Sequence, residues 1–143
     1  MLLIDIDGLK VINDMRGHVT GDAVIARMAD VIRESTREGD VCARLGGDEF
    51  LVFAACNTDT AMDIAGRILL KVSKPTMPLA GARASASIGV AVHDGTGADF
   101  DRMYRDADAA LYHARTESKT RIGLHVPTTA PNAQPSASPA FVG

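Results

Sequence analysis

The sequence predicts an α/β domain of the α+β type, in which helices flank a mixed central β-sheet of about five strands. Two observations predict this class. Strand-like apolar runs alternate with amphipathic helical patterns along the chain, and paired glycines separate two of the strand-like runs, as in a β-hairpin. The length of 143 residues, with 46% hydrophobic and 23% charged side chains, is ordinary for one globular domain with a sizeable core.

The first part of the chain predicts one strand followed by two helices. Leu2–Ile6 is apolar enough to form a buried strand. The segment Leu9–Met15 predicts a short helix that Gly17 breaks. Thr20 is the expected N-cap of a longer helix, whose apolar positions recur at steps of three and four residues until the helix ends near Arg37.

The rest of the chain alternates strands and helices. A hairpin is expected to join Val41–Leu45 to Phe50–Cys56 through Gly46 and Gly47, which supply the backbone freedom that a tight reversal needs. The later elements are a helix capped by Thr58 or Asp59 and ending before Pro75, a strand over Ala82–Val92, a helix from Asp99 to about Glu117, and a strand over Arg121–Val126. Gly89, inside a strand, indicates that another backbone or a ligand comes close.

Residues 127–143 differ from the rest in composition. They hold four of the six prolines, together with Ser, Thr, Ala, Asn and Gln. This composition is typical of a disordered tail or linker. We therefore expect one domain over residues 1–126 and a disordered tail over residues 127–143.

Charge and cysteine content exclude several classes of protein. The net charge of −3 gives no reason to expect binding to nucleic acid or to an anionic membrane. Cys42 and Cys56 form no CxxC pair, so we expect neither a disulfide nor zinc, and both thiols should act as small apolar strand residues in a reducing compartment. No signal or membrane segment is recognisable, which favours a cytoplasmic location.

Two acidic strand ends are the strongest functional signal. Asp5 lies where the first strand ends, and Asp48 lies at the tip of the expected hairpin. Together with the carbonyl of Ile6, these carboxylates suit magnesium, which takes one or two protein carboxylates and completes its shell with substrate oxygens. Asp48 or Glu49 is then the candidate base for metal-assisted attack by a hydroxyl. The competing interpretation is that these acids are solvated turn residues.

Other polar residues are candidates for nucleotide contacts. Lys10 follows the acidic strand end, and Arg115 and Lys119 lie one turn apart on the last expected helix, which would place their charges near phosphates. Asn13 and Asp22 offer amide and carboxylate edges that suit a purine such as guanine. On spacing alone, exposed helix positions are the better explanation of the Arg115–Lys119 pair, and the same holds for Asn13 and Asp22 taken singly.

With these residues assembled, the chain resembles the GGDEF domain of diguanylate cyclases from its first strand to Val126. The resemblance rests on motifs in the same order and spacing, namely Leu3–Asp7, Lys10, Ile12–Asp14, Gly17–His18, Gly21–Asp22, Gly46–Phe50, Ser87–Val90 and Ala107–Tyr112. It implies a nucleotidyl-cyclase or palm-like fold. It also implies synthesis of cyclic di-GMP from two GTP molecules, with release of pyrophosphate, in an antiparallel homodimer.

The resemblance also implies roles for individual residues. Asp5, the carbonyl of Ile6 and Asp48 would bind Mg²⁺ (or Mn²⁺), and Asp48 or Glu49 would assist deprotonation of the 3′-OH. The implied nucleotide contacts are Asn13 and Asp22 with guanine, Gly46 and Gly47 with the packed nucleotide, and Lys10, Arg115 and Lys119 with phosphates. Arg37 and Asp40 match the RxxD product-inhibition site.

The sequence departs from the family pattern in three places. A preceding helical segment with a D-x-L-T-x-L-x-N-R motif is absent, so we expect uncovered apolar surface on the sheet or its neighbouring helices. Gly8 replaces a larger residue. Arg115 and Lys119 reverse the usual order of lysine and arginine, which keeps the charge but changes the geometry. The alternative function is a catalytically inactive module that binds GTP or cyclic di-GMP; a purely structural domain leaves the motifs unexplained.

Overall fold

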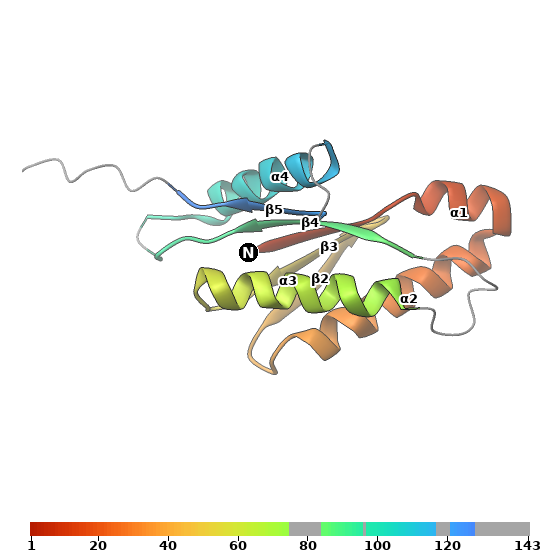
Figure 1. Ribbon diagram of the computed structural model, residues 1–143, viewed down its shortest axis with the longest axis horizontal. Coiled ribbons are helices and arrows are strands. Elements are labelled where there is room, and N and C mark those ends of the chain that lie inside the picture. Colours follow the sequence, from red (N-terminus) through yellow and green to blue (C-terminus); the bar gives the residue numbers. More distant parts are fainter. Residues whose placement is uncertain (75–83, 96, 117–120, 128–143) are drawn as a thin grey trace, which may run out of the picture.

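The computed structural model describes residues 1–74, 84–95, 97–116 and 121–127, and these residues form one five-stranded sheet with helices on both faces (Figure 1). The strand order is β2-β3-β1-β4-β5, and only the β4–β5 pair is parallel. The elements are β1 (Leu2–Ile6), α1 (Leu9–Arg16), α2 (His18–Ser35), β2 (Val41–Gly46), β3 (Glu49–Phe53), α3 (Thr58–Ser73), β4 (Ala86–Ala91), α4 (Phe100–Thr116) and β5 (Ile122–His125). The predicted class of fold is therefore confirmed.

Alternation along β1 divides the core into two layers. Leu2, Ile4 and Ile6 belong to the larger apolar cluster with residues of α2 and α3, whereas Leu3 belongs to a smaller cluster with Leu111 of α4. All five residues of β1 are buried, because the strand lies between β3 and β4 and is covered on both faces. By the same alternation, Asp5 lies on the face that α4 covers.

Two glycines let α4 lie close to the sheet. A Cβ atom at Gly89 would lie 2.1 Å from the carbonyl oxygen of Ala107, and one at Gly123 would lie 1.9 Å from that of Ala110. The close approach predicted at Gly89 is confirmed, and its partner is the backbone of α4. This packing brings the C-terminal end of α4, which carries Arg115, to the same edge of the sheet as Asp5.

The helix ends differ from the sequence-based expectation. Helix α2 begins at His18, directly after Gly17, rather than at a Thr20 cap; Gly17 has φ 83°, which turns the chain between α1 and α2 without a longer break. The hydroxyl of Thr20 instead donates to the carbonyl of Arg16. Helix α3 is capped by Asn57, whose side chain accepts a bond from the Thr60 amide, so the predicted caps at positions 58 and 59 are wrong.

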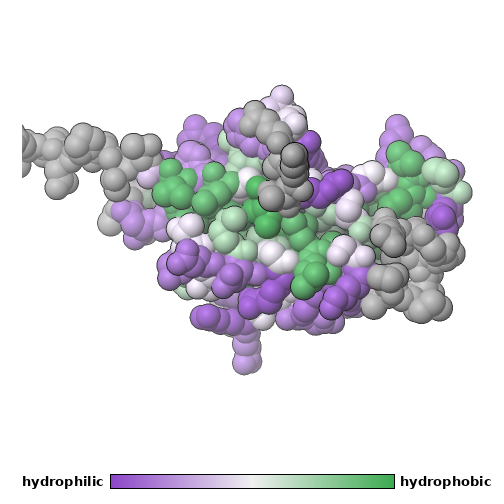
Figure 2. Space-filling view, in the orientation of Figure 1, coloured by the Kyte–Doolittle hydropathy of each residue, from purple (hydrophilic) through white to green (hydrophobic). Residues whose placement is uncertain are grey.

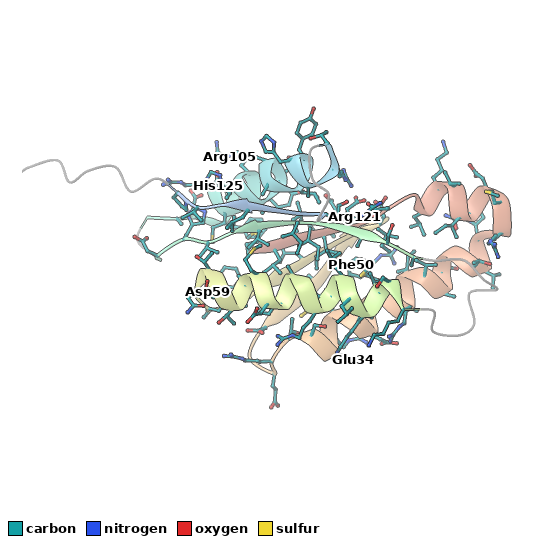
Figure 3. All side chains as sticks on the ribbon, in the orientation of Figure 1. Glu34, Phe50, Asp59, Arg105, Arg121 and His125 are labelled. Atoms are coloured by element: carbon teal, nitrogen blue, oxygen red, sulfur yellow. The ribbon has the colours of Figure 1, made fainter. Side chains whose placement is uncertain are left out.

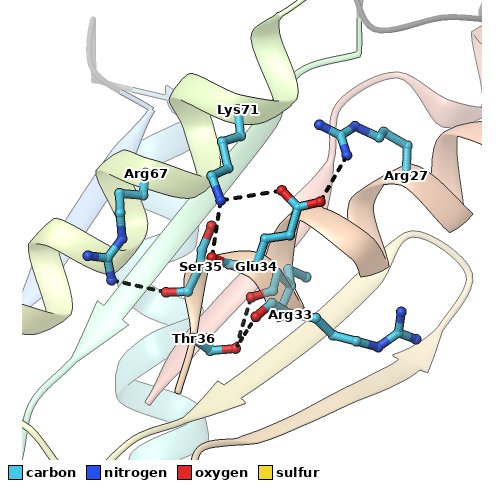
Figure 4. A network of polar contacts seen from close by, with 8 residues as sticks. Arg27, Arg33, Glu34, Ser35, Thr36, Arg67 and Lys71 are labelled. Carbon is cyan, nitrogen blue, oxygen red and sulfur yellow. Dashed lines mark hydrogen bonds and ion pairs between the residues drawn. The ribbon is translucent and has the colours of Figure 1, made fainter. Parts of the chain in front are cut away.

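Helix α2 ends at Ser35, two residues before the predicted end, where cations of α3 meet its last carbonyls (Figure 4). Arg67 donates to the carbonyl of Ser35, and Lys71 donates to the carbonyl and carboxylate of Glu34. Positive charge at a helix C-terminus is favourable, because the last carbonyls have no partners within the helix. Helix α3 thus fixes the end of α2 against the larger cluster.

The edge strand β2 corrects the expectation for the cysteines. Cys42 pairs opposite Val52, as the hairpin predicts, and both cysteines are free. Cys42 is nevertheless exposed, because every residue of β2 is exposed, and Cys56 lies beyond the end of β3. The prediction that both thiols are buried strand residues is therefore wrong.

Apolar side chains reach the surface on several elements, among them the β2–β3 hairpin and α1. Val41, Leu45 and Phe53 are exposed on β2 and β3, and Val11 and Met15 are exposed on α1. Figure 2 shows apolar groups in the middle of the face that is in view and again at the α1 end. No helix in the described ranges is both long and apolar enough to cross a membrane. The predicted tail lies outside the described residues, except for Pro127.

Candidate active site

The two acidic strand ends meet at one edge of the sheet, as the sequence predicts. Asp5 of β1 pairs in register with Glu49 of β3, and the Ile6 amide donates to the carbonyl of Asp48 at 3.0 Å. Neighbouring antiparallel strands place the end of one beside the start of the next. The backbone pairing of β1 with β3 therefore brings Asp5, Asp48 and Glu49 close together.

The hairpin tip is held by a residue that sequence reasoning missed. Gly47 has φ 52°, which confirms the need for glycine at the turn, and the pairing of β2 with β3 shifts register between Arg44 and Gly46. Arg44 donates through Nε (3.2 Å) and Nη2 (2.8 Å) to the carbonyl of Gly47. This paired contact fixes the turn that presents Asp48. The sequence signal is an arginine two residues before the glycine pair.

A cavity of about 440 Å³ opens beside these acids. Charged side chains dominate its lining, with three carboxylates and three cations among the residues Asp5, Ile6, Asp7, Gly8, Leu9, Lys10, Asp48, Ser87, Ala114, Arg115 and Arg121. The structure thus brings together the predicted residues Asp5, Ile6, Asp48, Lys10 and Arg115. Figure 3 labels Arg121 at the end of the sheet where β1 passes into α1.

Burial disfavours the ionised forms of two acids, Asp5 in the cavity lining and Glu49, which pairs with it on β3. Desolvation raises the pKa of Asp5, and the nearby Asp48 and Asp7 raise it further, although an ion pair with Arg115 opposes the shift. The pKa of Glu49 is also raised, first by burial and then by the charges of Asp5, Asp108 and Asp48. A cation placed among these carboxylates would relieve their mutual repulsion.

Asp7 differs from Asp5 in its partners. One of its oxygens accepts a hydrogen bond from the Ser87 hydroxyl at 2.8 Å, and the other contacts the guanidinium of Arg121. Both oxygens of Asp7 are therefore engaged by protein groups. Asp5 and Asp48 remain the carboxylates best placed to serve a ligand of the cavity.

The donor set fits magnesium. Within the described ranges, no group of three or more His, Cys, Asp and Glu side chains is arranged to hold a metal ion. Magnesium does not need such a group, because it keeps waters and borrows phosphate oxygens while one or two carboxylates hold it. Asp5, the carbonyl of Ile6 and Asp48 supply hard oxygen donors of this kind. The guanidinium of Arg115 on Asp5 shows that the position already favours positive charge.

The residues predicted to bind guanine, Asn13 on α1 and Asp22 on α2, lie outside the cavity lining. Asn13 packs against Gly21, where a Cβ atom would lie 1.8 Å from its Oδ1. That Oδ1 is buried, and no described residue bonds to it. Asp22, the residue after Gly21 on α2, is exposed. The Oδ1 of Asn13 is thus covered by protein, and the role of both residues stays a prediction.

The remaining predicted site residues are only partly placed. Gly46 and Gly47 are exposed at the hairpin tip and do not line the cavity. Lys119 lies outside the described residues. Arg37 and Asp40 form a turn before β2, in which the Arg37 amide donates to the Asp40 carboxylate at 2.9 Å and the Asp40 amide donates to the Arg37 carbonyl at 3.0 Å. An inhibitory role for this turn stays a prediction.

The fold and the cavity together define an α+β domain with an acidic hairpin beside a densely charged cavity, which is the class expected of nucleotide-binding phosphoryl-transfer domains. The family profile described as "Diguanylate cyclase, GGDEF domain" matches residues 1–121. The chain therefore belongs to the GGDEF family.

Named relatives support this membership. The chain is 38% identical over 121 residues to the bifunctional diguanylate cyclase/cyclic di-GMP phosphodiesterase MucR of Pseudomonas aeruginosa, and 38% identical over 124 residues to the diguanylate cyclase DgcM of Escherichia coli. These matches cover 83% and 85% of this chain, but only 18% of MucR and 30% of DgcM. The chain thus corresponds to a minor part of each relative.

Solved structures agree with the fold. The active GGEEF domain of a diguanylate cyclase from Vibrio cholerae has a TM-score of 0.78 and 29% identity, with 89% of this chain and 82% of that chain covered. The GGDEF domain of DgcB from Caulobacter crescentus, solved in complex with c-di-GMP, has a TM-score of 0.77 and 29% identity, with 86% and 75% covered.

Proposed function

We propose that this domain is a diguanylate cyclase, which condenses two GTP molecules into cyclic di-GMP and releases pyrophosphate. One observation carries the proposal: in a member of the GGDEF family, Asp5 and Asp48 converge at a cavity that also receives three cationic side chains. A mixture of carboxylates and cations is what a metal-bound triphosphate requires, because the acids hold the metal and the cations hold the phosphates. A solvated turn would need no such cavity.

Asp5, the carbonyl of Ile6 and Asp48 are the proposed ligands of Mg²⁺ or Mn²⁺. When bound, the metal neutralises charge on the triphosphate and lowers the pKa of the attacking 3′-OH. Arg115 is the proposed partner of a phosphate, but it also pairs with Asp5. When Arg115 binds a phosphate, it gives up its ion pair with Asp5, and the Asp5 carboxylate is then available to the metal ion.

Glu49 is the better candidate to accept the proton of the 3′-OH. The raised pKa of Glu49 increases its affinity for a proton, whereas Asp48, the other candidate, is assigned to the metal. Asp48 then remains a metal ligand. Lys10 and Lys119 are proposed to bind phosphates with Arg115, and Gly46 and Gly47 to let the nucleotide pack against the hairpin.

Asn13 and Asp22 are proposed to recognise guanine. Asn13 of α1 packs against Gly21 of α2, the residue before Asp22, so the two side chains come from adjacent segments, and a contact through Asn13 requires its amide to turn out of this packing. Each domain would hold one GTP, and two domains facing each other in a homodimer would complete both phosphodiester bonds. Arg37 and Asp40 are the proposed site at which cyclic di-GMP inhibits the enzyme.

The test is product formation by the purified protein with GTP and MgCl₂, followed by chromatography and mass spectrometry. We expect cyclic di-GMP from the unchanged protein and none from Asp48→Asn, which keeps the shape of the side chain but removes its charge. Asp30→Asn is the matched control, because Asp30 lies on the exposed face of α2 and pairs only with Arg33 among the described contacts. A folded dimer that binds GTP and makes no product would favour the alternative, an inactive binding module.

A further inference from the structure

Arg121 has an unusual backbone and an unusual position. It is the only non-glycine residue in the described ranges with positive φ, at 57°. This left-handed conformation is unfavourable for a residue with a Cβ atom, and glycine or asparagine would adopt it at lower cost. Arg121 nevertheless lies at the start of β5, where its carbonyl accepts a bond from the Ile88 amide at 2.9 Å.

The side chain of Arg121 is oriented by two other parts of the chain. Its guanidinium contacts Asp7 at the end of β1, and the other oxygen of Asp7 is held by Ser87 of β4, a residue that is only 1% exposed. The Asp7 amide donates in turn to the carbonyl of Ser85. The end of β1 and strand β4 therefore orient Arg121, whose side chain is still 52% exposed and lines the charged cavity.

We infer that Arg121 is a further phosphate-binding residue of this site, oriented by Asp7 and Ser87. The inference rests on the proposed function, because it assigns the anion in the cavity as the triphosphate of GTP. A guanidinium presents five N–H donors in a fixed plane, and the Arg121 side chain is about half exposed in the cavity lining, so it can reach an anion bound there. Bidentate contact with phosphate oxygens is the geometry that arginine favours.

A weaker role for Arg121 must be separated from this one. Asp7 adds a third carboxylate to the cavity, and its charge alone would repel a triphosphate. Arg121 could therefore assist binding only by neutralising Asp7, without touching the ligand. The two roles differ in one consequence, since removal of the Asp7 charge makes a purely neutralising arginine unnecessary.

The experiment compares the affinity of a non-hydrolysable GTP analogue and of GMP, both with Mg²⁺, by calorimetry and NMR titration. We expect Arg121→Gln to weaken binding of the GTP analogue about tenfold and to leave GMP within about twofold. The double variant Asp7→Asn with Arg121→Gln should bind the GTP analogue about tenfold more weakly than Asp7→Asn alone, because the phosphate contact is lost even when no Asp7 charge needs to be neutralised. The side-chain oxygen at position 7 in Asp7→Asn can still accept the hydrogen bond from the Ser87 hydroxyl, so the local contact between β1 and β4 is kept.

A further variant tests the backbone conformation of Arg121, and another serves as a control. Arg121→Gly removes the guanidinium and relaxes the positive φ, and it should lose the same affinity as Arg121→Gln. Arg33→Gln removes a guanidinium that pairs with Asp30 on the exposed face of α2, and it should change the affinity for neither the GTP analogue nor GMP. A double variant that binds the GTP analogue as tightly as Asp7→Asn alone, or an equal loss for GMP, would overturn the inference.

These experiments can distinguish failure of the inference about Arg121 from failure of the proposed cyclase activity. Arg121-dependent binding of the GTP analogue without formation of cyclic di-GMP would overturn the activity and leave the phosphate contact standing. Product formation with an unchanged affinity in Arg121→Gln would do the reverse. Failure of the unchanged protein to bind the GTP analogue would overturn both.

Discussion

Two cavities of nearly equal size lie at opposite ends of the sheet, and they differ in chemistry. The cavity beside Asp5 measures about 440 Å³ and has six charged side chains in its lining. The other measures about 430 Å³, lies between the start of β1 and the end of β4, and is lined mainly by apolar residues that include Phe53, Ala91 and Met103. Spaces of similar volume thus arise at both ends, and the residues at the strand ends decide which one can bind a charged ligand.

The largest predicted effect concerns chemistry at the charged end. Asp5→Asn removes a proposed metal ligand, and we expect turnover to fall by about 10²–10³-fold. The melting temperature should not fall, because burial already disfavours the charge of Asp5 and the amide avoids that cost. The measurements are the rate of cyclic di-GMP formation and thermal unfolding without metal. Turnover within tenfold of the unchanged protein would mean that Asp5 is not a metal ligand.

The opposite result is expected at the apolar end. Met103 lines the apolar cavity and packs, partly buried, against the cluster that contains Leu3 and Leu111. Met103→Ala should lower the free energy of unfolding by about 1–2 kcal/mol, less than a fully buried site would lose, and should leave turnover within about twofold. Urea unfolding and the cyclase assay measure the two quantities. Met15→Ala, at a residue that is 77% exposed, is the matched control.

Loss of activity in Met103→Ala at a temperature where the variant is folded would weaken the comparison. It would show that the two ends of the sheet are coupled through α4. The reverse finding, a loss of stability from Asp5→Asn, would show that the ion pair with Arg115 contributes more to folding than burial costs.

The charged end was the more predictable of the two, because its signal is local. An acidic residue after a buried strand and an acidic pair after two glycines can be read from the sequence, and the hairpin brings them together without further information. Gly89 was predictable for the same reason, since a glycine inside a strand indicates a close approach. The two glycines at the hairpin tip take positive φ values, as a tight reversal requires.

The features that were not predicted depend on contacts between distant segments. Arg121 and Asp7 are separated by 114 positions, so the sequence does not show that they meet. Cys42 has the neighbours of a buried strand residue, but its exposure follows from the position of β2 at the edge of the sheet, which the pattern of apolar residues does not determine. The cap at Asn57 was missed because Thr58 and Asp59 are equally suitable cap residues.

The smallest predicted effect separates the two ends by their response to pH. The pKa of Glu49 is raised in the folded state by burial and by neighbouring acids, so the folded state binds that proton more tightly than the unfolded chain does. This contribution to stability is complete below the unfolded value of 4.5 and is lost as the pH rises through the higher folded value. Glu49→Gln should therefore stabilise the metal-free protein at pH 7, by less than about 1 kcal/mol because solvent screens the partly exposed side chain. The gain should vanish towards pH 4.

Thermal unfolding between pH 4 and pH 8 measures this difference, and Glu38→Gln, at an exposed residue outside the cavity, is the control. Addition of Mg²⁺ with a GTP analogue should reduce or reverse the gain, because a cation in the cavity favours the ionised form of the acids around it. Met103→Ala should show the same loss of stability at every pH in the range. A gain in Glu49→Gln that does not depend on pH would mean that the shape of this side chain, rather than its charge, causes the gain.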